Sequence, residues 1–259
     1  MHKTGPAAAR LWQIDALRGL ALLNMIVYHG LYDWVYVFGH PVAWYDIWSP
    51  HCHVWQQYIC WSFLLLSGFS AVISRRLVRN GLLTAGCAAV LTAVTLLVIP
   101  EEKILFGVLH LLAAAMLLTT LLRPALDRIP PLAGAAGSAL LFFLLNQFPY
   151  GQLGFENLCL AELPSAWYRC NWFVVGLPDL SVFFSSDYFP LVPWLFLFWT
   201  GYFLGRRFWP VLRRYMTAPP RPLAPLCAAG SRTLLIYMLH QPVLYGILWL
   251  CDRAAVLAG

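Results

Sequence analysis

Residues 14–30 read IDALRGLALLNMIVYHG, an apolar run that carries Asp15, Arg18, Asn24 and His29. On an α-helix of 3.6 residues per turn, Arg18 and His29 share one face and lie about 16 Å apart along the axis. Asp15 falls about 60° to one side of Arg18. Ionisable side chains at membrane depth are costly and usually face a bundle interior or a wet cavity, so this stripe predicts a functional site.

A structural role is the alternative for each of these side chains. Asp15 and Arg18 could mark the cytoplasmic end of the helix and pair with one another, because helix ends tolerate charge. His29 could simply hydrogen-bond a neighbouring helix.

The rest of the chain has the composition of a polytopic membrane protein. Of its 259 residues, 61% are hydrophobic and 11% are charged, whereas soluble proteins carry about 25% charged residues. The net charge of +6 lies in short clusters between apolar segments, where it sets topology rather than binding nucleic acid. We expect one domain over residues 1–259. Residues 1–10 do not predict a secretory signal, since Asp15 and Arg18 interrupt the apolar core that would follow.

Seven apolar segments are long enough to predict membrane spans. They are residues 14–36, 55–74, 82–99, 104–122, 131–148, 189–206 and 230–250. With a cytoplasmic N-terminus, 14 of the 17 Lys and Arg residues fall on the inner side or just inside the span ends. The outer side keeps Lys103, Arg169 and Arg253. This positive-inside bias predicts an all-α bundle of seven spans with the N-terminus in the cytoplasm.

The predicted topology places His29, His110 and His240 in the outer halves of three different spans. Independent structural histidines have no reason to share one layer, so we predict a polar chamber that opens toward the outside. The first outer loop adds three more histidines, His40, His51 and His53.

The connection between the fifth and sixth predicted spans has about 40 residues, which is too long for a simple loop and predicts some structure of its own. It carries Asp179 and Asp187. It also carries Cys159 and Cys170, which could form a disulfide because they lie close together in a loop predicted to be outside.

A neutral histidine near pH 7 can accept a proton from an attacking amine or hydroxyl, as acyl transfer requires. His29 is one candidate for this base, and the residue pattern alone does not choose it over the other histidines. An outer-loop histidine would assist it and an aspartate would orient it; these candidates are His51, His53, Asp179 and Asp187. The HxH pattern at 51–53 could also bind metal, but no carboxylate pattern supports it and we expect no metal. No GxSxG motif predicts a serine nucleophile.

Two arginines lie near the cytoplasmic ends of their predicted spans. A guanidinium binds phosphate bidentately, so Arg18 and Arg232 could hold a phosphate-bearing donor that enters from the cytoplasm. Snorkelling to the inner surface is the alternative.

Five segments together resemble a known family. They are IDALRGLALLNMIVYH, FLLLSGFS at 63–70, ILFGVLH at 104–110, DYFPLVPWL at 187–195 and GSRTLLIYMLHQPVL at 230–244. As a set they resemble the bacterial relatives of the heparan-alpha-glucosaminide N-acetyltransferase catalytic domain, over nearly the whole chain. The spacing Arg18-x10-His29 also resembles the signature of the acyltransferase-3 family.

The resemblance implies that acetyl-CoA enters from the cytoplasm and that an amino sugar or sugar hydroxyl accepts the acetyl group on the far side. It makes His29 the base, although in the lysosomal enzyme the key histidine lies in the loop after the first span, where this chain has His40, His51 and His53. The residues that we expect to bind the acetyl-CoA donor are Asp15, Arg18, Arg232, His110 and His240.

We therefore predict an inner-membrane acyltransferase. Its partners would be acetyl-CoA, a small-molecule or glycan acceptor, membrane lipid and a second copy of the chain as a homodimer. The alternative is a small proton-coupled transporter or flippase that uses the intramembrane Asp, Arg and His as a relay. Inverted repeats would support that alternative, and none is visible in the sequence.

Overall fold

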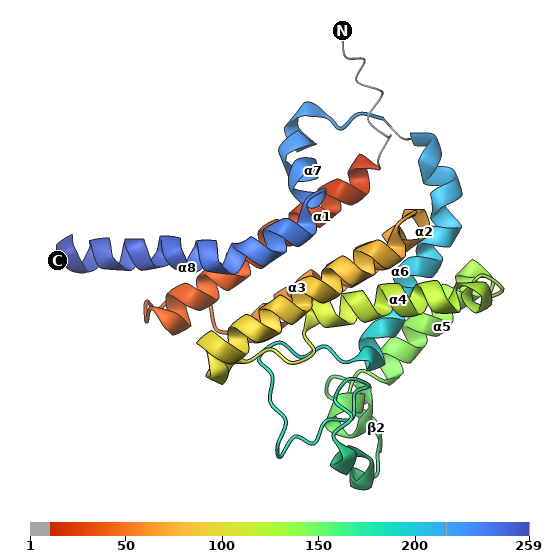
Figure 1. Ribbon diagram of the computed structural model, residues 1–259, viewed down its shortest axis with the longest axis horizontal. Helices are drawn as coiled ribbons and strands as arrows, with labels where there is room; N and C mark the ends of the chain where they lie inside the picture. The colour runs from red at the N-terminus through yellow and green to blue at the C-terminus, as the bar shows by residue number, and fades with distance from the viewer. Residues whose placement is uncertain (1–10, 216, 259) are drawn as a thin grey trace. The chain divides into compact units, whose positions relative to one another are not determined.

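The computed structural model describes residues 11–215 and 217–258 and is mostly helical, with one small hairpin (Figure 1). The helices are α1 (Trp12–Tyr32), α2 (Pro50–Ile73), α3 (Leu77–Val98), α4 (Val108–Leu126), α5 (Pro131–Leu144), α6 (Leu191–Leu212), α7 (Ala224–Gly230) and α8 (Thr233–Ala258). The strands are β1 (Gln152–Phe155) and β2 (Leu158–Glu162). A π-helix, Asp33–Val37, directly continues α1.

Among the described residues, four helices are long and apolar enough to cross a membrane, namely α2, α3, α4 and α8. The segment predicted as a span at 131–148 forms only the 14-residue helix α5. A helix of that length extends about 21 Å, which is less than the roughly 30 Å of a bilayer core. The polar residues Asp15, Arg18, Asn24 and His29 reduce the hydropathy of α1. The count of seven spans and the cytoplasmic N-terminus therefore stay predictions.

The chain divides into two compact units, and the prediction of one domain over 1–259 stays a prediction. The first unit contains residues 1–63 and 211–259, and the second contains residues 64–210. The boundary falls inside α2, so this helix contributes its first part to one unit and its last part to the other.

In the first unit, α1 packs against α7 and α8 (Figure 1). Gly19 lies directly against the backbone carbonyl of Leu226, and Gly230 lies against the carbonyl of Asp15. Such close approach requires small residues at the crossing. Asn24 accepts a hydrogen bond from the indole nitrogen of Trp55 at 2.9 Å, which joins α1 to α2.

The second unit pairs α3 with α4 and packs the last part of α2 against α6. Gly68 lies against the carbonyl of Phe198, and Gly201 against that of Leu65. Around α6 the buried core consists of Leu195, Phe198, Tyr202 and Phe203 with Ala71, Leu77, Ala115, Leu126 and Ala135. The buried aliphatic and aromatic side chains of α6 therefore pack within this unit.

Arg206, near the end of α6, is part of this packing. Its guanidinium donates to the carbonyls of Leu126 and Ile129 at 2.8 and 2.9 Å and to that of Asp127 at 2.8 Å. It also lies 3.4 Å from the Asp127 carboxylate. Because these bonds satisfy the carbonyls that end α4, Arg206 stabilises the turn between α4 and α5.

The connection between α5 and α6 is partly structured, as the sequence predicts. It contains the antiparallel pair β1 and β2, in which Gln152 faces Glu162. The disulfide that the sequence left open does not form in this structure, where Cys159 and Cys170 are both free and exposed. They lie on separate elements, Cys159 on β2 and Cys170 at the end of a short 3-10 helix, so their nearness in sequence does not join their thiols.

We expect Gly230→Ala to destabilise the first unit by about 1–3 kcal/mol, because the added methyl group would overlap the Asp15 carbonyl and push α7 away from α1. Thermal unfolding in detergent measures the effect. Gly246→Ala on α8 is the matched control, because its methyl group would meet open space. Equal unfolding midpoints for both variants would contradict this packing.

Candidate functional site

Two of the three predicted intramembrane histidines meet between α1 and α8. The ring centroids of His29 and His240 lie 5.1 Å apart, with the ring planes inclined by 55°. Both helices belong to the first unit and run side by side (Figure 1). The sequence predicts these histidines on separate spans in one layer, and here they form a direct pair.

His240 has one ring nitrogen fixed by the backbone of its own helix. Its Nδ1 lies 2.5 Å from the carbonyl oxygen of Tyr237. A carbonyl can only accept, so Nδ1 must carry the hydrogen, and Nε2 of the neutral ring then presents a lone pair. That Nε2 is buried and has no hydrogen-bond partner among the described residues. A buried acceptor without a partner is rare, and a catalytic role is one explanation for it.

Asp33 and Gln241 form a second polar contact next to this pair. Asp33 is only 2% exposed. The Gln241 Nε2 donates to both carboxylate oxygens of Asp33 at 2.9 Å. Because carboxylate oxygens only accept, this contact also fixes the orientation of the Gln241 amide. Its Oε1 then remains buried without a partner among the described side chains.

Asp33 occupies the first position of the π-helix that follows α1. A π-turn widens the helix by one residue and is often found at functional sites. His29 and Asp33 lie four residues apart on α1 and its extension, and their partners His240 and Gln241 are consecutive on α8. Two contacts thus fix α1 and α8 together at this level.

Arg18, Asp15 and Arg232 lie at the other end of the same helix pair. Gly230, just before α8, packs on the Asp15 carbonyl. The Arg18 guanidinium lies 3.7 Å from the buried Asp15 carboxylate, and Arg232 is exposed. Arg18 and His29 are 11 residues apart on one continuous helix, so about 16 Å separates the arginine end from the histidine end.

The histidines of the first predicted outer loop have different surroundings. His51 and His53 are exposed in the first turn of α2, and the His51 Nε2 lies 2.7 Å from the Trp44 carbonyl. His40 stacks on Trp34 and lies 2.9 Å from the Asp252 carboxylate. These contacts explain their positions structurally, and a role for His51 or His53 stays a prediction.

His110 and Asp187 belong to the second unit, at the start of α4. The His110 Nε2 lies 3.3 Å from the Thr92 hydroxyl of α3, and its Nδ1 is buried without a partner among the described residues. The Asp187 carboxylate accepts the Val108 backbone N–H at 3.0 Å, which satisfies a donor that the helix start leaves open. Burial raises the pKa of Asp187 to about 6, and the bond from Val108 partly opposes this shift.

This raised pKa predicts a pH-dependent stability. The folded state binds the Asp187 proton more tightly than the unfolded state, so the free energy of unfolding falls as pH rises from about 4 to about 6, by up to roughly 3 kcal/mol. Asp187→Asn keeps an acceptor for Val108 and cannot ionise. Between pH 4 and pH 7, we expect the thermal unfolding midpoint of this variant to fall by less than that of the wild type. Parallel curves would contradict this role.

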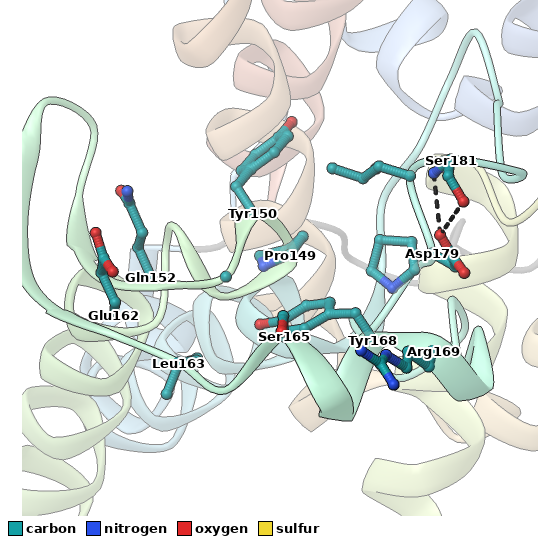
Figure 2. A pocket seen from close by; sticks show the side chains of 13 residues that line it. Pro149, Tyr150, Gln152, Glu162, Leu163, Ser165, Tyr168, Arg169, Asp179 and Ser181 are labelled. Carbon is teal, nitrogen blue, oxygen red and sulfur yellow. Dashed lines mark hydrogen bonds between the residues drawn. The ribbon is translucent and has the colours of Figure 1, made fainter.

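Asp179 lies in a pocket of the connection between α5 and α6. The pocket has a volume of about 620 Å³ and is lined by residues between Pro149 and Ser181 (Figure 2). The Asp179 Oδ1 accepts both the backbone N–H and the hydroxyl of Ser181, at 3.0 and 2.6 Å. These bonds lower the pKa of Asp179 and hold its carboxylate ionised. Whether it orients a histidine stays a prediction.

Asp33 and Gln241 are the site residues that sequence reasoning missed. Asp33 lies within the first predicted span, four residues after His29, and Gln241 directly follows His240. Helical spacing could have shown that Asp33 shares a face with His29. Over the described ranges 11–215 and 217–258, no group of three or more His, Cys, Asp or Glu residues could hold a metal ion.

Comparison with known proteins adds one match. A family model described as heparan-alpha-glucosaminide N-acetyltransferase, catalytic, matches residues 10–242, which is most of the chain. No curated protein and no solved structure matches the chain.

Proposed function

The chain belongs to the heparan-alpha-glucosaminide N-acetyltransferase catalytic family, and from this premise we propose that it moves an acetyl group from acetyl-CoA to an amino or hydroxyl group of an extracytoplasmic sugar. Family membership and four helices of membrane-spanning length give the general class, a membrane acetyltransferase. The donor, the sugar acceptor, a bacterial inner-membrane location and seven spans with a cytoplasmic N-terminus belong to the proposal.

The observation that carries the proposal is the His29–His240 pair, in which the Nε2 of His240 is buried and has no partner among the described residues. Transfer to an amine or hydroxyl needs a base for the proton that the nucleophile loses. The Nε2 of His240 meets that need because Nδ1 already donates to the Tyr237 carbonyl. The sequence favours His29 as the base; the fixed tautomer of His240 supports His240 instead, with His29 as the residue that positions its ring.

In the proposed reaction, the nitrogen or oxygen of the acceptor attacks the thioester carbonyl carbon. The new C–N or C–O bond forms as the C–S bond breaks, and the proton of the acceptor passes to Nε2 of His240. The leaving thiolate of CoA then takes that proton, which restores the neutral ring. The contact between Gln241 and Asp33 holds α8 against α1 and so keeps His240 in place.

The donor would bind at the other end of the same helices. Arg232 is exposed and can pair with a phosphate of CoA. Arg18 lies next to Asp15, which offsets its charge and makes it the weaker phosphate ligand of the two. About 16 Å along α1 separates this end from His29, a distance that an extended pantetheine arm of CoA would have to cover.

Vesicles with sugar inside and donor outside test the proposal. Purified protein is reconstituted with glucosamine in the lumen, and acetyl-CoA labelled on the acetyl group is added outside. We expect labelled acetylated sugar in the lumen and an equal amount of free CoA outside. Loss of sugar from the lumen without CoA release would support a transporter, and no CoA release with any of a panel of sugars would overturn the proposal.

A further inference from the structure

The pocket between Pro149 and Ser181 lies entirely within the second unit and contains none of the histidines of the proposed reaction. Its volume of about 620 Å³ falls in the range of about 300–1,000 Å³ that holds small molecules. Figure 2 shows Gln152 and Glu162 on one side, Asp179 and Ser181 on the other, and Tyr150 and Tyr168 between them.

Two aromatic rings give the pocket apolar faces. The Tyr168 hydroxyl donates to the Phe148 carbonyl at 2.5 Å, and this bond fixes the position of its ring. The Tyr150 side chain is 64% exposed, which leaves its ring available to a ligand. Aromatic rings in this setting combine an apolar surface with a polar end.

Polar groups surround these rings from several backbone segments. Glu162 and Gln152 are cross-strand partners on β2 and β1, so their side chains share one face of the hairpin. On the other side, the Asp179 Oδ1 takes both bonds from Ser181, and no described residue donates a hydrogen bond to Oδ2. Arg169 is the single basic residue of the lining.

We propose that this pocket binds a neutral or positively charged sugar ring. The tyrosine rings would pack against the apolar face of the sugar, and the carboxylates, the amide and the guanidinium would bind its hydroxyl groups. Two acidic residues against one basic residue disfavour an anionic ligand. The three charged residues of the lining disfavour a purely apolar ligand.

The bound sugar would be part of the acetyl acceptor, and only this role rests on the proposed function. Binding itself requires neither acetyl-CoA nor the His29–His240 pair. Sugar binding can therefore be measured without turnover, and the two proposals can fail independently.

The test uses the full-length protein in detergent, with saturation-transfer NMR titrations of glucosamine, glucose and glucuronate. We expect glucosamine and glucose to bind and glucuronate to bind at least tenfold more weakly. Tyr150→Ala should weaken binding of the first two sugars about tenfold, and Tyr150→Phe should retain it. Asp179→Asn, which can still accept the Ser181 bonds, should reduce the preference for glucosamine over glucose.

Glu101→Gln is the matched control, because Glu101 is an exposed acid of the same unit outside the pocket. Its affinities should equal those of the wild type. Each titration is repeated in the His240→Ala background, where binding should persist although acetyl transfer is lost. Failure of all three sugars to bind, tightest binding of glucuronate, or unchanged affinities in Tyr150→Ala would overturn the proposal.

Discussion

His240→Ala is expected to lower acceptor-dependent release of CoA by about 10²–10⁴-fold, which is the usual contribution of a general base. The fixed Nδ1–H and the unpartnered Nε2 make His240 the ring that takes the proton. Initial rates of CoA release in detergent, with saturating acetyl-CoA and glucosamine, measure the effect. Leu239→Ala is the matched control, because its side chain is half exposed on the same helix, and it should retain the wild-type rate.

Two substitutions at His29 distinguish a positioning role for this residue from a role as the base. A phenylalanine keeps a ring against His240 but has no nitrogen, so His29→Phe should retain more activity than His29→Ala if His29 positions its neighbour. Equal loss in both variants, with His240→Ala still active, would instead make His29 the base.

Gln241→Leu is expected to destabilise the protein by about 2–3 kcal/mol, because it removes both hydrogen bonds from a buried carboxylate. It should also lower turnover, since α8 loses a contact that holds His240 near His29. Thermal unfolding in detergent and the CoA release assay measure the two effects.

A double-mutant cycle gives the control for this contact. Replacing both partners with apolar residues leaves no unpaired buried group, so Asp33→Leu combined with Gln241→Leu should cost less than the sum of the single changes. Strictly additive losses of stability would contradict a direct interaction between Asp33 and Gln241.

The opening stretch of the sequence predicts α1 well, because it is a long apolar run whose polar stripe follows the helical period. Hydropathy does not predict the lengths of the other elements equally well. Residues 131–148 are mostly apolar, yet the helix ends at Leu144 and the chain enters a short 3-10 turn at Phe148. Hydropathy measures composition, and it cannot show where the backbone leaves a helix.

The sequence likewise predicts only part of the candidate site. The polar stripe points to His29, and the predicted histidine layer points to His240. The direct pair comes from the packing of α1 against α8, and the fixed tautomer comes from a contact within α8, between the His240 Nδ1 and the Tyr237 carbonyl three residues earlier. Asp33 and Gln241 meet across 208 residues of sequence, and no local pattern predicts such a partner.

The proposed reaction is direct transfer, in which a histidine removes a proton and forms no bond to the acetyl group. Rapid mixing of the wild-type protein with acetyl-labelled acetyl-CoA, with and without glucosamine, tests it most directly. We expect CoA to be released only when the sugar is present and the label to appear in the sugar alone. Label bound to the protein, or equal release of CoA without the sugar, would contradict it.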